Sequence, residues 1–541
     1  MSATGIALLF VVGLAVAAGA LVVWRRPAVS LGVFAAGLAI HNLVLMFLVT
    51  AEAPTLGIRA VQAWKELYVG LLGLRLVVDV ARGGGLPYLR DALARWRRQP
   101  AIPRAFDVIA VAFAVLLVIY LLIPSSLLPQ PSPTITQRIL SFRTLILLPV
   151  LYACGRIWSP FRTEDRRLLM MSVVAVAAFV SIAGLVELWF IPTQAWYVAG
   201  IYRYDVFTGY RFVGPGGLPE NFFQSTTTGF ALRRMVSTYL SPLGVAYTAL
   251  LVVPMALAGL LASPRHRRWW WAGLVLTLIA VALALTRLAL ACLAVEAILM
   301  AVLLHRRAAF AAAILALAAA ASALLVYPNV GPVVDYNLNA LRPALGGYLL
   351  GYDTSPYDPL SPNYDGTSPV LPDNLSADIL NRISSSQDES IQAHLNALPE
   401  GTKFVLEHPL GLGLGSSVPR YGSATGPSES AVLGIGGEVG LLGLVLFSSL
   451  YGGLVLVGCR LAWKYRREPD RLALPLVLAV GGIGLGPIVL TSQVWGDPSV
   501  TYVFWWIAGA CIAAWPRSAA VIPEGTGEPA EIRPGDLPSS P

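Results

Sequence analysis

The segment Leu406-Glu-His-Pro-Leu-Gly-Leu-Gly-Leu-Gly415 closes a long polar stretch that begins at Tyr327 and is rich in Pro, Asp, Ser and Asn. A second segment, Ser428-Glu-Ser-Ala-Val-Leu-Gly-Ile-Gly-Gly-Glu-Val-Gly-Leu-Leu-Gly443, returns the chain to apolar sequence. On both sides of this stretch the chain is almost continuously apolar. A connection of this length inside a membrane protein is usually functional or disordered, and the ordered motifs within it favour function.

The composition excludes a soluble protein. Hydrophobic residues make up 56% of the chain and charged residues only 13%, and the mean hydropathy is +0.68, so the chain belongs in a membrane. The formal net charge is +8, but the basic residues come as short clusters between apolar runs. That pattern is typical of cytoplasmic loops, not of a nucleic-acid-binding surface.

The apolar runs predict an all-α polytopic membrane protein. At about 17–25 residues per crossing, about twelve to thirteen transmembrane helices are expected. The predicted spans are 5–24, 29–50, 61–80, 106–124, 140–158, 167–190, 236–262, 269–285, 288–304, 308–326, 431–458, 472–492 and 500–515. Alternating them places the basic connections 24–27, 81–104, 161–167, 264–268, 305–307 and 459–471 on one side, which the positive-inside rule identifies as the cytoplasm.

This alternation predicts six regions. They are N-terminal transmembrane helices (1–190), an outer loop (191–235), central transmembrane helices (236–326), a large outer loop domain with amphipathic helices (327–430), C-terminal transmembrane helices (431–515) and a disordered cytoplasmic tail (516–541).

The sequence predicts neither a metal nor a nucleotide cofactor. The four cysteines lie within or at the ends of apolar segments and have no metal-ligand spacing, so neither a disulfide nor a zinc site is expected. No P-loop or dinucleotide fingerprint is present, and no cytoplasmic stretch is large enough for a nucleotide-binding domain. Any chemistry is therefore expected on the outer face.

Within the long loop, the first clear helical signal is Ser386-Gln-Asp-Glu389, which fits a capping box. Ile391, Leu395 and Leu398 then form one apolar stripe. Pro399 is expected to kink or restart this helix. We expect an amphipathic outer helix that lies over the mouth of the membrane bundle.

Arginines mark the outer ends of two predicted spans. The apolar run from Trp269 to Leu304 must reverse near its middle, where Arg287 lies. A cation in the bilayer costs at least about 2.5–3.5 kcal/mol, so Arg287 either faces a polar cavity, lies at the interface or partners Glu296. Arg233 and Arg234 precede the outer end of the predicted span 236–262. One of them could be an anchor that flanks the span, and Arg234 is the stronger candidate for binding a ligand. Two such guanidiniums suit an anionic phosphate, which each can grip bidentately.

Two residues are candidates for a general base. Glu429 opens the span after the long loop, where a carboxylate either complements the helix dipole or acts as a base. Taken alone, the structural role is the more common one. His394 in the outer helix is likewise more often an ordinary exposed histidine.

Four motifs occur in a characteristic order. They are Arg234 before Ser237-Thr-Tyr-Leu-Ser-Pro242, the turn Thr286-Arg287, the element His408 to Gly413, and Glu438 to Gly443. Together they resemble the O-antigen ligase and polymerase superfamily of bacterial surface-polysaccharide assembly, over roughly 233–446. Where ligases of that superfamily commonly place a His-Asn pair, this chain has Glu429-Ser430, which favours a polymerase or another acceptor over a strict ligase.

The resemblance implies a GT-C-like fold and a metal-independent, inverting glycosyltransferase in the cytoplasmic (inner) membrane. Its donor would be a glycan on a polyprenyl diphosphate such as undecaprenyl diphosphate, and its acceptor a hydroxyl of a glycan, lipid or protein on the outer face. Arg234 and Arg287 would bind the diphosphate, helped by Arg211 or Arg382 from the loops. Glu429 or His394 would be the base.

Two other classes of protein remain as alternatives. A lipid-linked oligosaccharide flippase or other transporter would place ionisable groups near the midplane, where His41 and Glu296 are the main examples. A structural scaffold would not need arginines at the outer rim. The charges at that rim favour outer-face chemistry.

Overall fold

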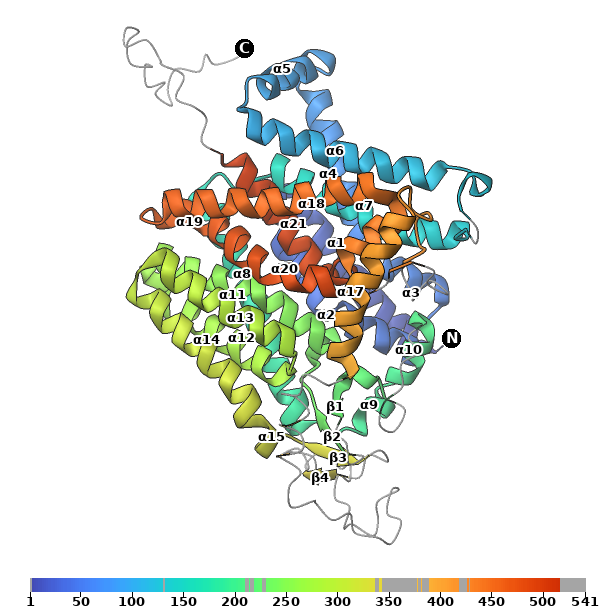
Figure 1. Ribbon diagram of the computed structural model, residues 1–541, viewed down its shortest axis with the longest axis vertical. Helices are drawn as coiled ribbons and strands as arrows, with labels where there is room; N and C mark the ends of the chain where they lie inside the picture. Colours follow the sequence, from blue (N-terminus) through green and yellow to red (C-terminus); the bar gives the residue numbers. More distant parts are fainter. Residues whose placement is uncertain are drawn as a thin grey trace, which may run out of the picture.

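The protein is a helical, multi-pass membrane protein. The computed structural model describes residues 2–129, 132–209, 214, 218–225, 230–335, 340–342, 377, 381, 389–417, 426–427 and 429–515. Within these ranges, eleven helices are long and apolar enough to cross a membrane. They form one bundle, which Figure 1 shows with α6 near the top, α1 and α2 near the centre and α11 to α14 at the lower left.

The membrane-spanning helices follow the predicted spans closely. The eleven are α1 (Ala3–Arg25), α2 (Ser30–Thr50, with the preceding turn), α6 (Ala101–Leu122), α7 (Ile135–Ile157), α8 (Thr163–Phe190), α11 (Pro242–Ala262), α12 (Arg267–Ala284), α13 (Arg287–Leu304), α14 (Arg307–Leu325), α18 (Ala431–Tyr465), and α19 (Pro469–Leu476) continued by a π-helix (Val477–Gly481) into α20 (Gly482–Thr491).

The two remaining predicted spans, 61–80 and 500–515, form helices that do not meet both criteria of length and apolarity. Helix α4 (Trp64–Arg82), preceded by α3 (Thr55–Gln62), carries several charges, and α21 (Pro498–Ala513) is short. Helix α4 nevertheless runs alongside α1 in the same direction, because the Tyr68 hydroxyl donates to the Val16 carbonyl and Arg75 donates to the Trp24 carbonyl. It therefore runs the length of the bundle as a polar helix.

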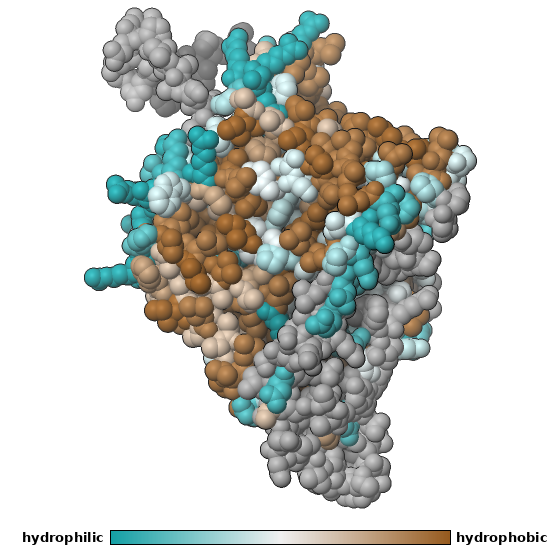
Figure 2. Space-filling model, in the orientation of Figure 1, coloured by the Kyte–Doolittle hydropathy of each residue, from teal (hydrophilic) through white to brown (hydrophobic). Residues whose placement is uncertain are grey.

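Contacts between distant basic turns gather them at one end of the bundle. Arg166 donates to the Asp470 carbonyl, and Arg306 donates to the Arg466 carbonyl over 3.3 Å. Helix α5 (Leu86–Arg97), in the predicted loop 81–104, has no buried residue and projects from the bundle in Figure 1. Figure 2 shows a largely hydrophobic face with hydrophilic residues along its upper and left edges.

A small sheet at the opposite end departs from the all-α prediction. Strands β1 (Phe223–Ser225), β2 (Phe230–Arg233), β3 (Val333–Asp335) and β4 (Ala340–Arg342) pair antiparallel in the order β1-β2-β3-β4. Leu232 pairs with Val333, so the sheet joins the two predicted outer loops. Strands of three or four residues are too short for a periodic sequence signal, which is why the sequence did not predict them. Short helices α9 (Ala195–Val198), α10 (Ile201–Thr208) and α15 (Tyr327–Val330) lie in the same outer regions.

The outer helix of the long loop is α17 (Glu389–Glu407), and it continues through Pro399 without ending. It packs along the first half of α18, where Gly401 lies against Leu433 and Gly436 against Val405 (Figure 1). The predicted kink or restart at Pro399 is therefore not needed to turn the chain. The turn comes afterwards, at the glycines that follow His408.

These glycines clamp a break in α18. The chain is non-helical at Val439 and Gly440, and the Leu412 and Gly413 amides donate to the carbonyls of Gly437 and Glu438 over 2.8 and 3.0 Å. The Glu438 carboxylate accepts from the Ser141 hydroxyl of α7 and lies near the backbone amides of Gly415 and Ser417. The motif thus fixes a loop that packs into the bundle beside α7.

Substitution of Gly440 tests this clamp. Gly440 has φ 73° and ψ −175°, a region that only glycine adopts readily, and an added Cβ would lie against the Pro409 carbonyl. Gly440→Ala is expected to cost about 1–3 kcal/mol and to lower the thermal unfolding midpoint in detergent. Gly452→Ala in the same helix is the control, because a Cβ there meets nothing within 4 Å and alanine favours a helix by about 1 kcal/mol. Equal midpoints for the two variants would contradict the clamp.

Candidate functional site

Arg234 links the small sheet to the membrane bundle. It follows β2, and its backbone amide donates to the Phe222 carbonyl over 2.8 Å. Its guanidinium donates to the Ala284 carbonyl over 2.9 Å, to the Asn221 carbonyl over 3.4 Å and to the Thr286 hydroxyl over 2.9 Å. The last carbonyls of a helix lack intrahelical partners, so Arg234 completes the end of α12.

The turn that Arg234 contacts is the predicted reversal at Arg287. Helix α12 ends at Leu285, which has φ 47°, and the extended Thr286 precedes Arg287, the first residue of α13. A non-glycine residue with positive φ is uncommon and makes this connection very tight. The hydrogen bond from Arg234 to Thr286 therefore brings together the segment after β2 and the start of α13, which carry the two candidate arginines Arg234 and Arg287. Arg287 is half-buried there.

Glu296 does not pair with Arg287. It lies in the middle of α13, is 0% exposed, and neither of its carboxyl oxygens has a hydrogen-bond partner in the described part of the chain. It faces Gly484 of α20. The structure thus rejects the alternative in which Arg287 merely neutralises Glu296.

A second contact chain joins Arg234 to the start of α18. The Tyr247 hydroxyl of α11 lies near the Ser492 side chain and close enough to Arg234 for the two to interact electrostatically. The Ser492 carbonyl in turn accepts from the Ala431 amide over 3.1 Å. Glu429 is exposed two residues before Ala431. The start of α18, which follows Glu429, therefore lies near the element that carries Arg234.

Asp497 adds a carboxylate to this cluster that the sequence analysis did not single out. It is the N-cap of α21, where it accepts from the Ser499 amide over 2.9 Å, and it interacts electrostatically with both Tyr239 and Tyr247. Burial raises the pKa of Asp497 above its ordinary value of 3.8, while the amides of Ser499 and Val500 oppose the rise. In the sequence, Asp497-Pro498 has the pattern of a helix N-cap followed by proline. This pattern indicates a structural role and not a functional site.

Tyr239 stays a neutral phenol beside this carboxylate. It lies in a short 3-10 helix (Ser237–Tyr239), and burial together with Asp497 raises its pKa to about 12. A small cavity lies next to it, lined by Ala35, Val173, Val176, Ala177, Tyr239, Thr248, Ser499 and Val503. The Tyr239 phenol and the Asp497 carboxyl therefore lie together, and Tyr247 interacts electrostatically with both Asp497 and Arg234.

Arg233 has a different role from Arg234. It forms an ion pair of 2.6 Å with Glu187, in which the two side chains are only 4% and 6% exposed, and it also donates to the Ile191 carbonyl over 2.8 Å. The preference for Arg234 over Arg233 as a ligand-binding residue is consistent with this burial. Arg233 anchors the sheet to the C-terminal end of α8.

The other predicted site residues cannot be placed. Arg211 and Arg382 lie outside the described residues. His394 lies in α17, but its side chain is not among those described. Their assignment therefore stays a prediction.

Comparison with models of known protein families gives no match, and comparison with curated proteins gives none either. Among the described residues, no group of three His, Cys, Asp or Glu side chains is arranged to hold a metal ion.

The structural role of Arg233, as distinct from that of Arg234, can be tested by measuring the free energy of unfolding. Arg233→Gln leaves Glu187 buried and unpaired, which is expected to cost about 3–5 kcal/mol. Arg203→Gln is the control, because its pair with Glu52 is 55% and 63% exposed and such pairs contribute at most about 1 kcal/mol. Unfolding of the purified protein in detergent measures both. Equal losses for the two variants would contradict a structural role for Arg233.

Proposed function

We propose that this protein is a membrane glycosyltransferase of the O-antigen ligase and polymerase type. It transfers a glycan from a polyprenyl diphosphate to an acceptor hydroxyl on the outer face of the cytoplasmic membrane. The observation that carries the proposal is the bond between Arg234 and Thr286, because it gathers Arg234, Arg287 and the N-terminus of α13 at the end opposite the basic turns. The order of sequence motifs supplies the donor class.

The arginine cluster suits a lipid diphosphate. Guanidiniums bind phosphate oxygens through charge-assisted hydrogen bonds, and the N-terminus of α13 adds a partial positive charge. When the glycosidic bond to the diphosphate breaks, negative charge develops on the leaving oxygen. Fixed positive groups that meet this charge lower the barrier, so Arg234 and Arg287 would act mainly in the transition state.

Asp497 is the base that the described contacts favour. The acceptor oxygen attacks the anomeric carbon, its proton passes to the carboxylate, and the diphosphate leaves with inversion. A carboxyl with a raised pKa is a stronger base than an ordinary aspartate, and Asp497 lies beside Tyr247, which also interacts with Arg234. Glu429 and His394 are the alternative bases from the sequence.

Transfer by the purified protein in liposomes tests the proposal. The substrates are a fluorescent oligosaccharide on polyprenyl diphosphate and a cell-envelope extract as acceptor, with EDTA present. Label on a larger product is expected. Label that only crosses the bilayer unchanged would overturn the proposal and establish the flippase alternative.

Substitution of the arginines tests the diphosphate site. A charged hydrogen bond contributes about 1.5–3 kcal/mol, so Arg234→Ala and Arg287→Ala are each expected to lower kcat/KM by about 10- to 100-fold. Arg203→Ala is the control, because this arginine is also in the outer region but mostly exposed. Wild-type kcat/KM in folded Arg287→Ala protein would contradict the assignment.

The pH profile distinguishes the three bases. A base must be deprotonated, so activity rises with pH through its pKa, and the raised pKa of Asp497 places this rise above the range of an ordinary aspartate. Asp497→Ser keeps a good helix N-cap but has no carboxylate, so it is expected to lose the acidic limb and about 10²- to 10⁴-fold in rate.

Glu429→Gln and His394→Ala are the companion variants. Each is expected to keep the acidic limb of the wild-type profile. An unchanged limb in Asp497→Ser, together with its loss in one of these two, would assign the base to that residue.

A further inference from the structure

Helix α5 has an exposed apolar face. Leu86, Leu89, Leu93 and Trp96 follow one another at intervals of three and four residues, so they lie on one side of the helix. The three leucines are 70%, 46% and 48% exposed, and no residue of α5 is buried. A contiguous apolar face of this kind indicates that something other than water covers it.

The rest of the α5 surface is basic. Arg90 and Arg97 each lie four residues after a leucine of the apolar face, so they border that face. The connection 82–104 contains six arginines and one aspartate, so its net charge is +5. The side of α5 away from the leucines carries three further exposed charged residues, Asp91, Arg95 and Arg98. A helix with one apolar and one basic side is typical of a segment that lies in the headgroup layer of a membrane.

Two contacts fix the C-terminal end of α5 at the polar end of α6. Trp96 Nε1 donates to Asp107 Oδ2 over 2.9 Å, and the Gln99 side chain accepts from Arg156 of α7. Asp107 is the last charged residue of α6, because 108–122 contains none. The Trp96 indole therefore lies where polar sequence gives way to apolar sequence, which is the level at which tryptophan is enriched in membrane proteins.

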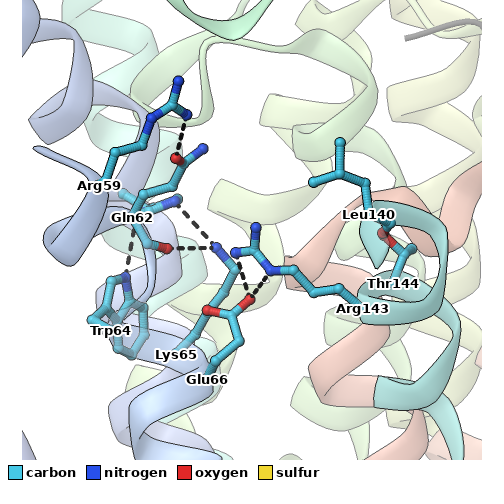
Figure 3. Close-up of polar contacts among 9 residues, drawn as sticks. Arg59, Gln62, Trp64, Lys65, Glu66, Leu140, Arg143 and Thr144 are labelled. Atoms are coloured by element: carbon cyan, nitrogen blue, oxygen red, sulfur yellow. Dashed lines mark hydrogen bonds and ion pairs between the residues drawn. The ribbon is translucent and has the colours of Figure 1, made fainter. Parts of the chain in front are cut away.

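The N-terminal end of α5 follows a helix that is fixed in the bundle. Helix α4 is held to α7 by the ion pair of Glu66 with Arg143, which Figure 3 shows, and to α1 by the hydrogen bond from Arg75 to the Trp24 carbonyl. The next residues, Gly84 and Gly85, have φ of 97° and 69°, a region that glycine adopts readily. They turn the chain away from α4 and into α5.

The position of α5 identifies lipid as its neighbour. The helix projects beyond α6, away from the other helices (Figure 1), and in Figure 2 this projecting part has hydrophobic residues on its right and hydrophilic residues on its left. Exposed apolar residues follow α6 along its length, namely Val108, Val111, Val115, Ile119 and Leu122. In a membrane-spanning helix such a stripe faces acyl chains. Helix α5 therefore leaves the bundle beside a helix that lipid surrounds.

We propose that α5 is an interfacial helix that binds anionic lipid headgroups with Arg90 and Arg97. Its leucines lie at the boundary between headgroups and acyl chains, and the two guanidiniums bind headgroup phosphates at the rim of the apolar face. The net charge of +5 in 82–104 favours anionic over zwitterionic lipids, because a negative membrane surface attracts each arginine near it. This binding does not depend on the proposed transferase function.

Nitroxide labels on the full-length protein test the placement of α5. Leu93→Cys lies on the apolar face, and Asp91→Cys on the opposite side is the matched control. Both are made in a Cys459→Ser background, since the other three native cysteines are buried. In nanodiscs of phosphatidylcholine and phosphatidylglycerol, the label at 93 is expected to be more accessible to oxygen, which concentrates in lipid. The label at 91 is expected to be more accessible to a water-soluble nickel chelate.

Two results of this measurement would overturn the proposal. Equal access of the nickel chelate to both labels would mean that water surrounds α5. A label at 93 that neither oxygen nor the nickel chelate reaches would mean that protein covers the apolar face.

Amide hydrogen exchange over 86–98 tests the preference for anionic lipid. The wild-type helix is expected to exchange more slowly in nanodiscs that contain phosphatidylglycerol than in phosphatidylcholine alone. Each arginine near an anionic surface strengthens binding about fivefold, so the double variant Arg90→Gln/Arg97→Gln should reduce this slowing about 10-fold or more. Arg95→Gln/Arg98→Gln is the control, because it removes the same charge from the other side of the helix and should have a smaller effect. Equal exchange of the wild type in both lipids, or equal losses in the two double variants, would contradict the proposed site.

Discussion

The hydrogen bonds that Arg234 donates to Ala284 and Thr286 hold together segments that are about fifty residues apart in sequence. One segment comes from the outer sheet, and the other is the tight reversal between α12 and α13. Without this guanidinium, the Ala284 carbonyl would lack this partner and the sheet would lose a direct link to the bundle. The positive charge of the outer cluster therefore also has a structural function.

The bilayer imposes the same constraint throughout the bundle. A polar group there is stabilised by a partner within the protein, because no water is present to supply one; the Glu296 carboxyl is an exception among the described residues. Arg233 pairs with Glu187, Glu438 accepts from Ser141, and His41 accepts from Trp64. Two of these contacts join different helices and the first joins strand β2 to α8, so the polar residues help to determine how the apolar helices are arranged.

Much of the membrane architecture could be predicted from the sequence. The reversal at Arg287 followed from an apolar run that was too long for one crossing and just long enough for two. Helix α4 was predicted as the span 61–80 from the number of its apolar residues, even though its charges give it a polar character. The strands were missed because they are too short to show alternation.

The site was less predictable, because its contacts join residues that are far apart in sequence. Glu438 was recognised only as part of a motif, since its partner Ser141 is nearly three hundred residues away. Asp497 looked like an ordinary helix cap, and its neighbours Tyr239 and Tyr247 come from other elements.

Binding of the lipid carrier is the most direct test of the central claim that the outer cluster holds a diphosphate. The measurement compares polyprenyl diphosphate with polyprenyl monophosphate, using wild-type protein, Arg234→Ala, Arg287→Ala and the double variant in detergent. We expect tighter binding of the diphosphate, a loss of about tenfold or more in each single variant, and non-additive losses in the double variant because both groups grip one ligand. Equal Kd values for the diphosphate in all four proteins would contradict the account.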